Sequence, residues 1–133
     1  MTKSKKIGEK IVLLKEARLQ LLKLHKLLID IERKGFEQSN GQITSGQFLN
    51  LLVNDQNFSW LRKFSILIVE IDEMLDLDDG FTEAMIEKHL SKMRELMNLK
   101  TGDEEFDEKY KNFLQINSEV VVKHSELKKV LSE

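Results

Sequence analysis

Apolar residues recur at steps of three and four along most of the 133-residue chain, and no long segment alternates with a period of two. This spacing places apolar side chains along one side of a helix, so the pattern predicts an all-α fold. The first helix is expected from about Lys5 to about Gln38, as a long helix of a bundle or as part of a coiled coil. Its apolar side carries a heptad-like series of residues: Ile11, Leu14, Ala17, Leu21, Leu24, Leu28 and Ile31.

Small polar residues mark the end of this helix and the start of the next two. The Ser-Asn-Gly sequence at 39–41 is typical of a helix break. Thr44 or Ser45 can cap a short linking helix that ends near Leu52. Asp55 can then cap a third helix.

The third helix, expected from near Asn57 to near Leu75, is the most apolar in the chain. Ile66 and Val69 project away from its main apolar face. A helix that is apolar around most of its circumference belongs in the middle of a fold or against another subunit. The residues expected on the main apolar face are Trp60, Leu61, Phe64, Leu67, Ile68, Ile71 and Leu75.

Two further helices are expected in the C-terminal half. Thr82 can cap a fourth helix that runs to about Leu99. Thr101 and Glu104 have capping-box spacing, so a fifth helix is expected from about Asp103 to Leu131. The prediction is a single domain over residues 1–133, built as an antiparallel bundle of four main helices plus one short linking helix.

Charge is distributed unevenly although the net charge is only -2. Residues 1–66 carry 12 Lys and Arg against 6 Asp and Glu, whereas residues 67–133 carry 9 against 17. The two halves therefore have net charges of +6 and −8. They can attract each other within one fold, or the basic half can present a face to an acidic partner. The single Trp and single Tyr offer no stacking platform, so a nucleic-acid partner is not expected.

The motifs that carry common chemistries are absent from the sequence. There is no phosphate-binding GxxxxGK[ST] loop, no GxSxG nucleophile elbow and no Glu-x-x-His pair, and the chain has no cysteine. No cofactor is therefore predicted, and an enzymatic function is not expected. No window contains the roughly 18 apolar residues of a membrane span, so we expect a cytoplasmic protein.

Polar residues on apolar helix faces are the one constellation that suggests a site. Arg18, His25 and Glu32 are spaced by seven residues and form a polar line on the first helix. These groups can satisfy one another within the core and fix the register of the helices. Alternatively, the interior can hold a small acidic ligand or a metal ion, with Arg18 gripping a carboxylate. The other candidates are Asp72, His89, Asn117 and His124.

The strings LHKLLIDIERKGFE and FLNLLVNDQNFSWLRKFSILIVEIDE resemble an uncharacterised family of small bacterial all-helical proteins of unknown function. The resemblance covers about residues 24–75. It implies no catalytic role for any residue, but it directs attention to Asp55, Trp60, Arg62 and Asp72. Where the family has Asp-Pro, this chain has Asp55 followed by Gln56. The matching residues are His25, Asp30, Glu32, Arg33, Asn54, Asp55, Phe58, Trp60, Leu61, Arg62, Ser65, Asp72 and Glu73.

The sequence favours a non-enzymatic helical interaction or self-association module. Its partner is expected to be another protein or a second copy of the chain, as in a homodimer. Ile66 and Val69 are the expected contact residues, and Trp60 is the expected packed anchor. The alternative function is a bundle that binds a small acidic ligand or a metal ion at a histidine-lined interior.

Overall fold

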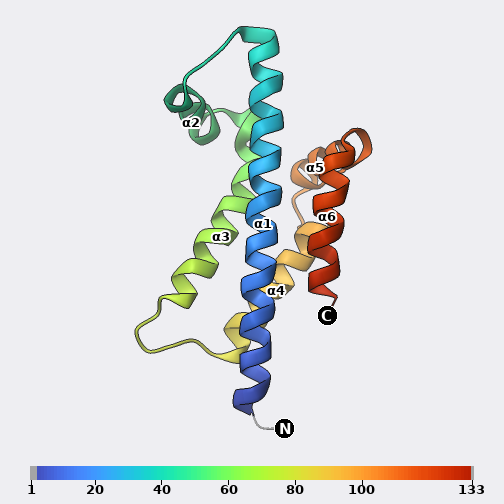
Figure 1. Cartoon of the computed structure of the whole chain (residues 1–133). Coiled ribbons are helices and arrows are strands. Elements are labelled where there is room, and N and C mark those ends of the chain that lie inside the picture. Colours follow the sequence, from blue (N-terminus) through green and yellow to red (C-terminus); the bar gives the residue numbers. More distant parts are fainter. Residues whose placement is uncertain (1–2, 133) are drawn as a thin grey trace.

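The computed structural model describes the backbone of residues 3–132 and the side chains of residues 7–132. Within this range it contains six α-helices, one 3₁₀ helix and no strand, so the all-α prediction is confirmed (Figure 1). None of the described helices is both long enough and apolar enough to cross a membrane. The elements are α1 (Lys3–Asn40), α2 (Ser45–Asn54), η1 (Gln56–Leu61), α3 (Arg62–Leu75), α4 (Glu83–Met97), α5 (Glu104–Ile116) and α6 (Ser118–Leu131).

Helix α1 forms the long axis against which α3, α4 and α6 pack (Figure 1). At 1.5 Å per residue, its 38 residues span about 57 Å. The heptad-like series predicted from the sequence faces the core along the middle of this helix, and the ends of the series, Ile11 and Ile31, are half-buried. The helix ends where Gly41 adopts a positive φ of 84°, a conformation that glycine adopts without steric cost. The fully buried members are Leu14, Ala17, Leu21, Leu24 and Leu28.

Helix α2 begins with a capping box, in which the Gln47 backbone N–H donates to the Thr44 hydroxyl at 3.1 Å and the Thr44 N–H donates to the Gln47 side chain at 2.9 Å. The expected third helix is divided into two elements. Asp55 accepts a hydrogen bond from the Asn57 N–H at 2.8 Å and starts η1, which leads into α3. This 3₁₀ segment brings Phe58 against the rings of Phe36 and Phe48 and so anchors α2.

The expected fifth helix is wrong as a single helix, because it breaks at Asn117 into α5 and α6. Asn117 has an extended backbone (φ −123°, ψ 107°) and serves as the last cap of α5 and the first cap of α6. The break turns α6 back across α5, which brings Tyr110 and His124 into contact. The predicted cap is also corrected: Asp103 rather than Thr101 accepts from the Phe106 N–H, at 3.2 Å. Thr101 instead donates from its hydroxyl to Asp107 at 2.8 Å.

One buried hydrophobic cluster draws residues from α1, η1, α3, α4, α5 and α6. Its largest fully buried side chains include Tyr110, Phe64 and Phe106. Helix α2 contributes only Leu52 to the edge of this cluster. Helix α2 therefore lies outside the main core and is held chiefly through η1.

Ion pairs within the molecule join the basic first half of the chain to its acidic second half. Lys10 Nζ lies 2.7 Å from carboxylate oxygens of both Glu83 and Glu87. Lys63 Nζ lies 3.5 Å from Asp103 Oδ2. Part of the opposite charge of the two halves is thus neutralised inside the fold.

Candidate functional site

Arg18 already holds a carboxylate within the molecule. Its Nε and Nη2 atoms donate to the two oxygens of Asp72, at 2.5 and 3.0 Å, in a bidentate pair that joins α1 to α3. The hydrogen bond to Asp72 raises the pKa of Arg18 above its usual value. The guanidinium that was predicted to grip an acidic ligand is therefore engaged by another predicted site residue, Asp72.

Glu32 is also engaged by a side chain of the protein. The Trp60 indole Nε1–H donates to Glu32 Oε2 at 3.1 Å. The Trp60 ring is 4% exposed and packs against Phe64, Phe106 and Phe113. Trp60 is therefore a packed residue, and a Trp needs such a polar partner when it is buried.

The three histidines lie in three different environments. His25 on α1 stacks on Phe64, with ring centroids 5.9 Å apart and planes inclined by 17°. His89 on α4 is buried, and its Nδ1 lies 2.8 Å from the Met85 carbonyl oxygen one turn earlier. His124 on α6 lies against Tyr110 of α5. Each ring therefore has a separate neighbour within the fold.

His25 and His124 are linked only through intervening rings. Phe64 stacks on His25 and contacts Tyr110 edge-on, with ring centroids 5.7 Å apart. The ring centroids of Tyr110 and His124 are 5.4 Å apart. The Asn117 side chain makes no cap hydrogen bond, and its place in the fold is the break between α5 and α6. No group of three or more His, Asp or Glu residues in the described part of the chain could hold a metal ion.

Tyr110 and His124 form the most strongly perturbed titratable pair in the described chain. The Tyr110 hydroxyl and His124 Nδ1 are 2.7 Å apart. Burial raises the pKa of Tyr110 well above its ordinary value, and burial lowers the pKa of His124 to about 4. At neutral pH the tyrosine is protonated and the imidazole is neutral, so the hydroxyl donates to the ring nitrogen.

His25 lines an open apolar groove where α1, α2, η1 and α3 meet. The groove has a volume of about 430 Å³. Its polar side chains are His25, Arg62 and Ser65. Arg62 and Ser65 already make hydrogen bonds to backbone carbonyl groups nearby. Arg62 donates to the carbonyl oxygens of Leu52 and Val53, and Ser65 donates to the Arg62 carbonyl at 3.1 Å. The apolar lining residues are Ile29, Leu49, Leu52, Val53, Leu61 and Ile66.

The His25 imidazole is the polar group of this groove that has no hydrogen-bond partner among the described residues. No hydrogen bond among the described residues involves its ring nitrogens. Burial lowers the pKa of His25, which favours the neutral ring at pH 7. Apart from the Arg62 guanidinium, the groove therefore presents an uncharged, mostly apolar surface.

An exposed apolar surface borders this groove. Ile66 and Val69 on α3 are 55% and 53% exposed, and Leu49 and Val53 on α2 are 60% and 56% exposed. We call these four residues the α2–α3 surface. The sequence analysis identified Ile66 and Val69 but missed the two α2 residues. Helix α2 carried a signal, because Phe48, Leu49, Leu51, Leu52 and Val53 surround it with apolar groups.

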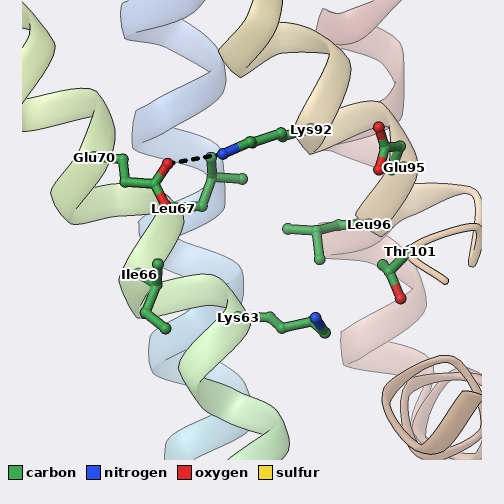
Figure 2. Close-up of a pocket in the computed structure, with 8 residues that line it drawn as sticks. All are labelled: Lys63, Ile66, Leu67, Glu70, Lys92, Glu95, Leu96 and Thr101. Atoms are coloured by element: carbon green, nitrogen blue, oxygen red, sulfur yellow. Dashed lines mark hydrogen bonds and ion pairs between the residues drawn. The ribbon is translucent and has the colours of Figure 1, made fainter. Parts of the chain in front are cut away.

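Ile66 also borders a second depression, between α3 and α4, of about 240 Å³ (Figure 2). Lys92 Nζ reaches across it and donates a hydrogen bond to Glu70 Oε2 at 2.9 Å. This hydrogen bond lowers the pKa of Glu70. Lys63 points across the same depression in Figure 2 and pairs with Asp103. Lys92 and Lys63 are thus both paired with carboxylates, and the lining residues form no nucleophile with an adjacent base.

Comparisons of the chain with protein-family models, with curated proteins and with solved structures found no match. The resemblance to an uncharacterised bacterial family stays a prediction from the sequence.

Proposed function

We propose that the protein is a non-enzymatic helical interaction module that associates with itself through the α2–α3 surface. One observation carries this proposal: Leu49, Val53, Ile66 and Val69 are each more than half exposed. The first three line one apolar groove, and Val69 follows Ile66 one turn later on α3. Single exposed apolar residues are common on protein surfaces, but adjoining ones that border a groove are typical of interaction sites.

The engagement of the other candidate residues favours this function over ligand binding in the interior. Arg18 binds Asp72, Glu32 accepts from Trp60, and His124 accepts from Tyr110. Each of these three groups would first have to lose a partner within the protein before it could hold a small acidic ligand. An interaction through the surface requires no such rearrangement.

The antiparallel four-helix arrangement expected from the sequence belongs to this proposal. Helices α1, α3, α4 and α6 would be its main members. In Figure 1, α3 and α6 run in the direction opposite to α1, which supports this arrangement. Such a bundle buries one face of α3 and leaves Ile66 and Val69 facing outward, beside α2. A cytoplasmic location and a bacterial origin stay predictions from the sequence.

The first test is the association state of a double variant, Ile66→Glu with Val69→Glu. The wild-type protein is expected to sediment as an oligomer at micromolar concentrations. Two carboxylates in the contact would have to lose hydration without partners, so the dissociation constant should rise at least about a hundredfold. Sedimentation equilibrium over a concentration series measures this change directly.

A matched control places the same charges on a different exposed surface. Val121→Glu with Val122→Glu alters two exposed residues of α6 that lie outside the α2–α3 surface. This variant should associate as the wild type does, and both variants should retain the wild-type helix content by circular dichroism. A wild-type protein that is monomeric throughout, or an oligomer that survives Ile66→Glu with Val69→Glu, contradicts the proposal.

A further inference from the structure

Exposed charges of opposite sign lie on α1 and α3. Lys15 and Lys26 are exposed on α1, and Glu73 and Asp76 are exposed on α3 and at its cap. None of these four side chains makes an ion pair or hydrogen bond with another described residue. They differ in this from Arg18, whose charge is paired within the molecule.

The bidentate contact of Arg18 with Asp72 fixes which parts of the two helices lie at the same level. Helix α3 runs opposite to α1 (Figure 1). Lys15 lies three residues before Arg18, and Asp76 lies four residues after Asp72, so both lie toward the same end of the helix pair. By the same register, Leu19 on α1 lies near the level of Val69 on α3. Leu19 is also exposed, at 44%.

We propose that the self-association is an isologous dimer whose twofold axis runs parallel to α1, so that α1 of each copy lies against α3 of the other. This inference rests on the self-association proposed above and adds the symmetry of the dimer, in which Val69 of the α2–α3 surface lies in the contact with α1. Rotation by 180° about such an axis exchanges the places of α1 and α3 in the contact but leaves the height of each residue along the axis unchanged. Lys15 of one copy then faces Glu73 and Asp76 of the second copy, and Leu19 faces Val69.

The other twofold arrangement of the same face does not bring these opposite charges together. An axis lying in the face but perpendicular to α1 would place α1 against α1 and α3 against α3. Lys15 would then face residues of α1, and Glu73 and Asp76 would face residues of α3. Opposite charges across an interface fix its register, which favours the axis parallel to α1.

A reciprocal charge reversal tests the proposed arrangement. In Lys15→Glu, each contact between the copies brings together carboxylates only. In Glu73→Lys with Asp76→Lys, each contact brings together lysines only. Each variant alone should dimerise roughly tenfold more weakly than the wild type at low ionic strength. An equimolar mixture should recover wild-type affinity, because both contacts in the heterodimer again join opposite charges.

Native mass spectrometry distinguishes the heterodimer from both homodimers by mass, and sedimentation equilibrium gives the affinities. Lys111→Glu reverses an exposed charge on α5 and serves as the control, which should dimerise as the wild type does. The defect of the single variants should shrink in high salt, since exposed charges are screened.

The outcomes separate this inference from the proposed function. If the wild type dimerises but the variants show no defect, or their mixture shows no recovery, the twofold arrangement is wrong and the self-association stands. If the lysine variant of α3 dimerises more tightly, the arrangement is also wrong. If the wild type is monomeric throughout, both proposals fail together.

Discussion

Among single residues, His124 carries the clearest consequence for stability. Its imidazole packs against Tyr110 and accepts the phenol hydrogen, so protonation would remove the acceptor that the phenol needs. The pKa of His124 is about 4 in the folded protein, because burial disfavours the charged ring. In the unfolded chain the pKa returns to about 6.5. The unfolded state therefore binds more protons than the folded state between these two values.

This difference predicts that the protein loses stability as the pH falls from about 6.5 toward 4. In His124→Gln the side chain does not titrate, so the variant should show a weaker pH dependence. Because the ring is partly solvated, we expect the wild type to lose about 1 kcal/mol more than the variant between pH 7 and pH 5. Urea unfolding at several pH values measures this. A gap between the two proteins that is constant over this range contradicts the assignment.

The polar residues of the site were found from the sequence, but their partners were not. Spacing placed Arg18, His25 and Glu32 on one side of α1, because helical periodicity is a property of one segment. The contacts of Arg18 with Asp72 and of Trp60 with Glu32 depend on how α1 packs against α3 and η1. Periodicity tells which face is buried but not which helix covers it.

Among the elements, two glycines illustrate how the backbone decides the effect of one substitution. Gly35 lies inside α1 and Gly80 lies in the turn between α3 and α4, and a β-carbon would meet no atom within 4 Å at either position. They differ in conformation, since Gly80 has a φ of 81° and Gly35 is helical. Packing is thus the same at both sites, and backbone conformation is what differs.

We therefore predict opposite effects of replacing these glycines by alanine. Gly35→Ala should stabilise the protein by about 1 kcal/mol, because alanine is the better helix former. Gly80→Ala should destabilise it by about 1 kcal/mol, because an L-residue is strained at positive φ. Thermal unfolding of the two variants beside the wild type checks both signs. Effects of the same sign would contradict the conformational explanation.

The helices of the first 100 residues could be predicted closely, and the break at Asn117 could not. Turn glycines and capping residues such as Thr44, Asp55 and Thr82 marked the earlier boundaries. At Asn117 the apolar spacing of α5 continues into α6 without a glycine or proline. The break is stabilised by tertiary contacts of Tyr110 and Val120 with the core, which a local pattern does not contain.

On the scale of the whole molecule, α1 and α6 make the most extensive contact between any two elements. Leu127 on α6 is fully buried in the cluster that also includes residues of α1 and α4. The helices that share this cluster are distant in sequence. The core is therefore expected to unfold as one cooperative unit.

Leu127→Ala tests this cooperativity. The cavity should lower the free energy of unfolding by about 2–5 kcal/mol. Leu77→Ala, at an exposed position, should have little effect and serves as the control. Amide hydrogen exchange of the most protected amides of α1 should accelerate together with exchange in α6. Faster exchange confined to α6 would show that the helices open independently.

The contact between α1 and α6 also has a consequence for biosynthesis. Helix α1 leaves the ribosome long before α6, because α2, η1, α3, α4 and α5 must be made in between. Until α6 emerges, the apolar series on α1 lacks its most extensive cover, and a nascent chain with such a stripe is a target for chaperones. The fold can close only when its most distant helices are both present, so translation itself delays the completion of the core.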